Sequence, residues 1–216
     1  MRKLLVAAAC LAASTSLAQP PGPAGPGAAP GPGANPGATV LDNARVRVFR
    51  ASGTRALAAH PAAVIIALED GPARKMGDAF WSGSLDALSG AGQDAGSFLI
   101  VEPRPSGPPL PSPSAAVSAT PPPVFVGMNF TPLFENDRVR VLRARMDVGA
   151  KEGLHTHGSD LVVIYLSDGE VEDTANGTTK VDHWKRGDVE FEARGSSHST
   201  RNLGGAIDAV IVGLKP

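Results

Sequence analysis

The sequence predicts an all-β protein composed of two related globular units. Short aliphatic runs separated by turn residues recur along the chain, which is the pattern of a β-sandwich or β-barrel. Helical periodicity is absent from nearly all of it. A segment near the start of the first unit also recurs at the start of the second. The aliphatic runs are Val46/Val48, Val64–Ile66, Phe98–Val101, Val139/Val141, Leu161–Leu166, Val189/Phe191 and Ala209–Val212.

The first 18 residues have the pattern of an export signal. Two basic residues precede the apolar stretch Leu4–Ala13, and the small residues Ser16 and Ala18 occupy the positions that a signal peptidase reads. We expect cleavage before Gln19, which makes the protein periplasmic or secreted. A lipid anchor on Cys10 is the alternative, but the apolar region before this cysteine is short.

Two segments rich in proline divide the chain. Sixteen of the 20 prolines lie within residues 20–36 and 103–123, among Gly, Ala and Ser. Such composition buries too little side chain to offset the entropy of ordering, so we predict linkers at residues 19–38 and 103–123. The globular units are then residues 39–102 and 124–216.

Charge and hydropathy exclude two classes of partner. The 20 basic and 21 acidic residues are spread along the chain, so no cationic surface is expected for a phosphate backbone. No apolar run reaches the roughly 18 residues that a membrane-spanning helix needs. We therefore expect a small-molecule ligand, with no nucleic acid and no membrane span, and the sequence leaves a homodimer open.

The two units contain an internal repeat. Residues 41–51 read LDNARVRVFRA and residues 134–144 read FENDRVRVLRA, which are identical at seven of 11 positions. Further along, Trp81 is matched with Trp184. A duplicated β-unit predicts that the two copies pack together and cover each other's sheet edges.

The second unit carries four of the five histidines. Residues two apart on a strand face the same side, so His155 and His157 present two imidazoles at a separation suited to one cation. His198 supplies a third if an antiparallel barrel brings its strand alongside. Neutral imidazoles suit iron, manganese, nickel, copper or zinc. Surface or hydrogen-bonded histidines are the alternative explanation.

The residues around these histidines resemble the two motifs of the cupin superfamily. Residues 149–169 resemble G-x5-H-x-H-x(3,4)-E-x6-G, and residues 187–202 resemble G-x5-P-x-G-x2-H-x3-N. The resemblance implies an antiparallel jelly-roll β-barrel in which His155, His157 and His198 bind a metal inside the mouth. Together with the repeat, it implies a bicupin of two such units joined by the proline-rich linker.

The carboxylates depart from the cupin pattern. The expected glutamate ligand falls on Leu161 or Val162. Asp160 is the nearest replacement, either as a fourth ligand or as a residue that orients a histidine, and a solvated loop position is the alternative. Glu190 and Glu192 alternate with apolar residues, so we expect them to face away from the apolar side and from the metal.

Features present in both units favour a folding role. Arg50 and Arg143 occupy equivalent positions and are therefore expected to pack or to face outward. His60 aligns with His157, but nothing in the first unit matches His198, so His60 is expected to be structural and the first unit a degenerate copy. A separate signal, the Asn176-Gly177 dipeptide, predicts a hairpin in the second unit.

The leading hypothesis is an exported metal-binding cupin that acts as a metal-dependent oxygenase on a small polar substrate. Its expected cofactor is one divalent transition metal, and no catalytic acid or base is assigned. The competing hypothesis is a non-enzymatic cupin that binds or senses a small molecule and holds a structural metal or none. Cupins host many unrelated activities, so the resemblance implies a pocket and leaves the reaction open.

Overall fold

The computed structural model describes residues 37–53, 60, 62–83, 96–105 and 125–216. The predicted export signal and most of the two predicted proline-rich linkers lie outside these residues. All regular secondary structure in the described part is β-strand, which confirms the predicted all-β class. That part contains no helix with the length and hydropathy needed to cross a bilayer.

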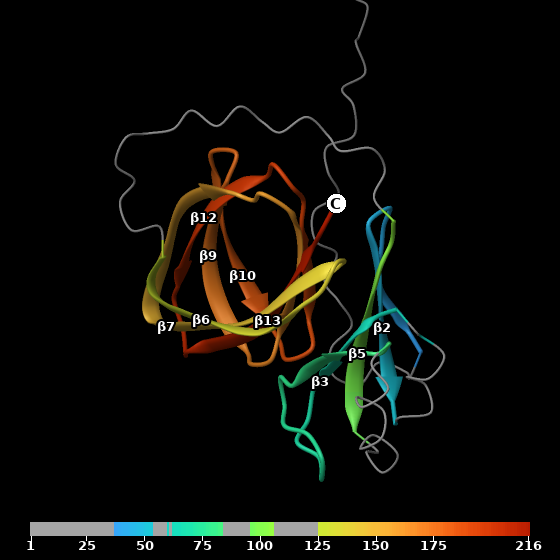
Figure 1. Cartoon of the computed structure of the whole chain (residues 1–216). Helices are drawn as coiled ribbons and strands as arrows, with labels where there is room; N and C mark the ends of the chain where they lie inside the picture. Colours follow the sequence, from blue (N-terminus) through green and yellow to red (C-terminus); the bar gives the residue numbers. More distant parts are fainter. Residues whose placement is uncertain (1–36, 54–59, 61, 84–95, 106–124) are drawn as a thin grey trace, which may run out of the picture.

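The described strands form two antiparallel sheets, one in each unit (Figure 1). The strands of the first unit are β1 (Thr39–Asp42), β2 (Val46–Ser52), β3 (Val64–Ala67), β4 (Ala79–Trp81) and β5 (Ser97–Pro103). The strands of the second unit are β6 (Phe125–Glu135), β7 (Val139–Thr156), β8 (Asp160–Tyr165), β9 (Gly169–Ala175), β10 (Thr178–Trp184), β11 (Val189–Glu192), β12 (Ser197–Asn202) and β13 (Ile207–Leu214).

The second unit curls into a jelly-roll barrel, and Figure 1 shows its strands surrounding a common interior. The strand order is β10-β9-β12-β7-β13-β8-β11, with β6 paired to β7. Strand β7 changes partner along its length, from β13 as far as Met146 to β12 from Lys151 onward. Gly149 lies at this change with a φ of +72°, a conformation that residues with a Cβ rarely adopt. The predicted Asn176-Gly177 turn joins β9 to β10, which confirms the hairpin.

The first unit repeats part of this architecture as a five-stranded sheet of order β1-β2-β5-β3-β4. Strands β2, β5, β3 and β4 pair in the same sequence as β7, β13, β8 and β11. Val64 faces Trp81 between β3 and β4, just as Val162 faces Phe191 between β8 and β11. Trp81 therefore corresponds to Phe191, and the match with Trp184 that the sequence suggested is wrong.

Between β3 and β4 the first unit lacks the hairpin that the second unit has between β8 and β11, and no described residues of the first unit form a counterpart of β12. In the first unit, Lys75 Nζ lies 3.4 Å from the carboxylate of Asp70, five residues earlier. The equivalent pair in the second unit, Lys185 and Asp168, is 3.0 Å apart but has the whole β9–β10 hairpin between its members. Because residues 84–95 lie outside the described part, a second complete barrel in the first unit stays a prediction.

One face of the first sheet packs against the outer face of the barrel. Both contribute aliphatic side chains that are almost completely buried, which removes apolar surface from water on each side. These side chains are Val46, Val48, Val64, Ile66, Leu68, Leu99 and Val101 in the first unit, and Val139, Val141, Val162, Ile164, Leu166, Val189, Val210, Val212 and Leu214 in the second. The expected packing of the two units on each other is thus present.

Two arginines at equivalent positions of the repeat cross this interface in opposite directions. Arg50 donates to the carbonyl of Gly187 at 2.6 Å, and Arg143 donates to the carbonyl of Met76 at 3.4 Å. Arg143 also lies 2.5 Å from a carboxylate oxygen of Asp208. Gly187 has a φ of +85°, and a Cβ there would lie 2.7 Å from the Arg50 guanidinium. The expected packing role of these arginines is confirmed.

Candidate metal centre

The three predicted histidines meet inside the barrel. His155 faces His198 across the pairing of β7 with β12, and His157 follows just beyond the end of β7. The Nε2 atoms of His155 and His157 are 3.1 Å apart, and one ring nitrogen from each of the three lies within 4.8 Å of the others. Two imidazoles on one ion at about 2.1 Å leave their nitrogens roughly 3.0–3.4 Å apart. The geometry fits a shared cation.

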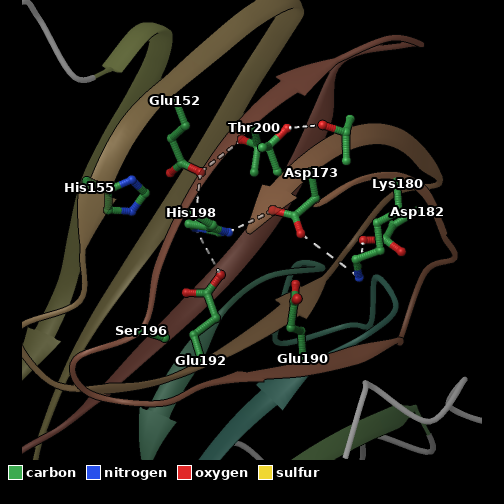
Figure 2. A network of polar contacts seen from close by, with 12 residues as sticks. Glu152, His155, Asp173, Lys180, Asp182, Glu190, Glu192, Ser196, His198 and Thr200 are labelled. Atoms are coloured by element: carbon green, nitrogen blue, oxygen red, sulfur yellow. Dashed lines mark hydrogen bonds and ion pairs between the residues drawn. The ribbon is translucent and has the colours of Figure 1, made fainter. Parts of the chain in front are cut away.

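Hydrogen bonds at Nδ1 orient two of these rings. The Nδ1–H of His155 donates to the carbonyl of Gly153 at 3.0 Å, and the Nδ1–H of His198 donates to the carboxylate of Asp173 at 3.0 Å (Figure 2). An acceptor at Nδ1 fixes the proton there and leaves the lone pair on Nε2. Both Nε2 atoms are therefore prepared to bind a metal.

His157 is held in the same tautomer by a serine. Ser196 Oγ–H donates to the carbonyl of Ala193 at 2.7 Å, so its lone pair accepts the Nδ1–H of His157 at 2.9 Å. Burial, together with the two neighbouring imidazoles, lowers the pKa of His157 to about 4. This ring is neutral near pH 7, which is the form that binds metal.

The carboxylate of Asp160 serves a different contact. Its Oδ2 lies 2.6 Å from Nε of Arg45 in the first unit, and its Oδ1 accepts the backbone N–H of Arg194 at 2.8 Å. The expectation that Asp160 is a fourth ligand or orients a histidine is therefore corrected. At the start of β8, this residue joins the two units through an ion pair.

The positions of the missing cupin glutamate are both apolar in the structure. Leu161 lines the barrel cavity, whereas Val162 points the other way into the core between the units and is fully buried. Leu161 is thus the residue that occupies the inward position on β8. No carboxylate reaches the histidines from this strand.

Glu192 supplies the carboxylate instead, from strand β11. Its two oxygens lie 3.4 Å from Nε2 of His157 and 3.7 Å from Nε2 of His198, and its side chain is only 14% exposed. The expectation that Glu190 and Glu192 face away from the metal is wrong. The alternation along β11 was correct, but its apolar face, with Phe191, packs toward the first unit, so the acidic face looks into the barrel.

The four inward groups fit a divalent cation. Three imidazole lone pairs and a buried carboxylate facing one another repel unless a proton or a cation lies between them. Burial and the neighbouring carboxylates of Glu190 and Glu152 raise the pKa of Glu192. A transition metal that accepts nitrogen and oxygen ligands satisfies all four groups.

Further charged groups surround the histidines (Figure 2). Asp173, which holds His198, also lies 4.0 Å from Nζ of Lys180, and Lys180 is paired with Asp182 at 2.8 Å. Glu152 Oε2 lies 3.8 Å from Nε2 of His198. The hairpin that the first unit lacks thus contributes Asp173, Lys180 and Asp182 to the surroundings of the site.

The histidines open into a cavity of about 430 Å³ inside the barrel. Its wall is mainly apolar, and Tyr165 and Trp184 stack in it with ring centroids 4.3 Å apart. The Tyr165 hydroxyl donates to Glu190 at 2.9 Å, and burial raises the pKa of Glu190 to about 7. The remaining lining residues include Phe125, Met128, Phe130, Leu142, Ala144, Met146, Val163, Val171, Ile207, Ala209 and Ile211.

In the first unit, His60 takes the structural role expected of it. Its Nδ1 lies 2.6 Å from a carboxylate oxygen of Glu102, and its ring packs on Phe49 with centroids 4.4 Å apart. Within the described residues, His155, His157 and His198 form the one group of three or more potential ligands close enough to share an ion. The candidate metal site therefore lies in the barrel.

Comparison with known proteins found similar solved structures. No protein-family model matches the chain, and no curated protein is significantly similar to it. A cupin domain from Bordetella pertussis Tohama I is 24% identical, with a TM-score of 0.40, over 42% of this chain and 96% of that one. An RmlC-like cupin from Shewanella frigidimarina is 20% identical, with a TM-score of 0.36, over 42% and 78% of the two chains. A cupin superfamily protein from Desulfitobacterium hafniense is 18% identical, with a TM-score of 0.35, over 52% and 94%.

The second unit has the jelly-roll fold of a cupin domain. Its own residues carry this conclusion: both motifs lie where the cupin resemblance implied, and the three histidines converge inside the barrel. The group fits a metal-binding cupin.

Proposed function

We propose that this protein is an exported cupin that binds one divalent transition metal and catalyses the oxidation of a small substrate by dioxygen. The convergence of His155, His157 and His198 with their Nε2 lone pairs directed at one point carries the proposal. Glu192 is the carboxylate best placed to complete the ligand set. When bound, a redox-active metal would supply the electron transfer that side chains alone lack.

The residues of this chain have three tasks in such a reaction. Gly153, Asp173 and Ser196 hold the imidazoles in the metal-binding tautomer. The aliphatic wall of the barrel excludes water from the reacting atoms. Glu190 is half-buried beside the cavity and accepts a hydrogen bond from Tyr165. It can accept a proton, or a second hydrogen bond, from the substrate.

A second candidate is a binding or sensing cupin in which the metal is structural. The largely apolar cavity favours it, because such a wall suits the retention of a ligand and needs no catalytic acid or base. Metal binding is common to both candidates, so turnover is the property that separates them.

The first experiment is elemental analysis of the purified full chain. We expect about one transition metal per chain, lost in His155→Ala and in His198→Ala. His183→Ala is the matched control, because His183 is exposed on β10 and lies outside the group. A chain that contains no metal, and whose thermal stability ignores added iron, manganese, nickel, copper and zinc, contradicts the proposal.

Turnover is tested by oxygen consumption with the metal-loaded protein and a panel of thiols, amino acids and phenols. Consumption that is lost in His198→Ala supports the oxygenase, and a loaded protein inert to the panel supports binding or sensing. Export is tested by the N-terminal sequence of the protein recovered from the periplasm or medium. A mature chain beginning at Gln19 is expected, and an intact Met1 in the cytoplasm contradicts export.

A further inference from the structure

Resting on the proposed function only in taking the barrel cavity as the ligand site, we infer that the side chains of this cavity favour a cationic or uncharged ligand with an apolar body over a carboxylate. The inference comes from the charges and shape of the wall. It concerns the class of substrate, which neither the motifs nor the fold specifies.

Among the residues that the structure describes, every Asp, Glu, Lys or Arg that lines the cavity is acidic. The acidic residues are Glu152, Asp173, Asp182, Glu190 and Glu192. The nearby Lys180 is already paired with Asp182 at 2.8 Å and lies 4.0 Å from Asp173. An entering anion would lose its hydration and find no side-chain cation in return. An amine would find carboxyl groups on several sides.

Glu190 provides the most specific anchor for such a ligand. Its Oε2 accepts the Tyr165 hydroxyl at 2.9 Å, whereas Oε1 has no hydrogen-bond partner among the described residues. The carboxyl group is half-buried on the cavity wall, where a hydrogen bond to a charged donor is stronger than in water. A ligand N–H or O–H that reaches Oε1 satisfies this atom.

The rest of the wall suits an aromatic or other apolar body. The stacked Tyr165 and Trp184 form one side, and Met128 and Met146 lie among the aliphatic residues of the wall. Methionine side chains adapt to ring edges and to irregular shapes. At about 430 Å³ the cavity is at the small end of ligand pockets, which span about 300–1,000 Å³.

The test compares three probes that share one ring and differ in charge: tyramine, the neutral alcohol tyrosol and 3-(4-hydroxyphenyl)propionate. Calorimetric titration is done with the full chain, both zinc-loaded and metal-free. In the metal-free form we expect tyramine to bind at least ~10-fold more tightly than the propionate, with tyrosol between them. Equal or tighter binding of the propionate, or no binding of any probe, overturns the inference.

A matched pair of variants locates the selectivity. Glu190→Gln keeps the size of the side chain and an acceptor for Tyr165, and should lower the preference for tyramine over tyrosol at least ~3-fold. Glu172→Gln on β9 is the control, because Glu172 pairs with Arg201 outside the cavity and should leave the preference unchanged. Thermal melting of both variants verifies folding, and an unchanged preference in folded Glu190→Gln contradicts the role of this anchor.

The two proposals fail in different ways. Absence of bound metal contradicts the proposed centre, and leaves the ranking of probes in the metal-free protein as a separate measurement. Conversely, a metal-loaded protein whose metal-free form prefers the propionate retains the centre and loses the inferred charge selectivity.

Discussion

The two units begin from nearly the same sequence, yet within the part of the chain that the structure describes only the second holds a candidate site. Both have the same turn, in which Asn43 and Asn136 accept the backbone N–H groups two and three residues ahead. Both send an arginine, Arg50 or Arg143, across the interface. What they share therefore serves folding and packing, and the chemistry lies in what differs.

The difference is mainly the β9–β10 hairpin together with the histidines. In the second unit, this hairpin adds wall to the barrel and supplies Asp173 behind His198 and Trp184 beside Tyr165. In the first unit, a short turn closed by Asp70 and Lys75 stands in its place. In the second unit, the hairpin and β12 thus both contribute residues to the wall that encloses the cavity.

The largest expected effect concerns the core that the units share. Ile66 is fully buried in it, and Ile66→Ala should lower the free energy of unfolding by about 2–5 kcal/mol. Because the core belongs to both units, they should unfold together. Urea unfolding followed by fluorescence in Trp81→Phe and in Trp184→Phe reports on each unit separately, since the sequence has two tryptophans.

Two separate transitions in these single-tryptophan proteins would contradict the expected joint unfolding of the two units, because the first unit would then be an independent domain. Ile65→Ala is the control for position, since Ile65 on the same strand is equally buried but packs in a cluster formed by the first unit alone. Ile65→Ala should also destabilise the protein, although the Ile65 side chain lies outside the core that the two units share.

The next prediction tests whether Glu192 or Asp160 is the carboxylate of the candidate metal site. Glu192→Gln should weaken metal binding roughly 10- to 100-fold, a range typical of losing a group that supports a metal. Asp160→Asn should leave metal affinity nearly unchanged and lower stability, because Asp160 pairs with Arg45. Competition titration against a metal chelator measures both, and a larger loss in Asp160→Asn would restore the ligand that the sequence favoured.

A smaller effect depends on pH. The folded-state pKa of His157, about 4, lies below its ordinary value of 6.5, so the unfolded chain binds more protons between these values. The contribution of His157 to stability is therefore complete above pH 6.5 and is lost as the pH falls toward 4. Glu190, with its pKa raised to about 7, acts in the opposite direction between its ordinary value of 4.5 and 7.

The metal-free protein separates these contributions. Relative to His157→Asn, the wild-type midpoint of urea unfolding should fall between pH 6.5 and pH 4, because the variant lacks the titrating ring. A difference that stays constant over this range contradicts the burial of a neutral imidazole at this position.

The smallest effect tests the equivalence of the repeats. Asn43→Ala and Asn136→Ala each remove two hydrogen bonds from the same kind of turn, and each should cost about 1 kcal/mol. Denaturant titration should give nearly equal losses. A large inequality would show that the shared turns support the two sheets to different degrees.

Much of the site could be predicted because strand geometry is local. Residues two apart along a strand point to the same face, which placed His155 with His157. The motif resemblance added His198 to this pair. The missing carboxylate could not be found in this way. Alternation along β11 indicates two faces, but it does not say which face looks inward when both faces of a barrel wall are covered.

The sequence by itself determined the strands that carry aliphatic runs, the repeat and the pairing of His155 with His157, because these depend on short-range patterns of polarity and spacing. Its resemblance to the cupin motifs indicated His198. Only the tertiary structure decided that Glu192 faces the histidines and that Asp160 binds Arg45. The physical reason is the first sheet. By burying the apolar outer face of the barrel, it lets aliphatic residues lie outside and carboxylates lie inside, contrary to the usual expectation for a strand.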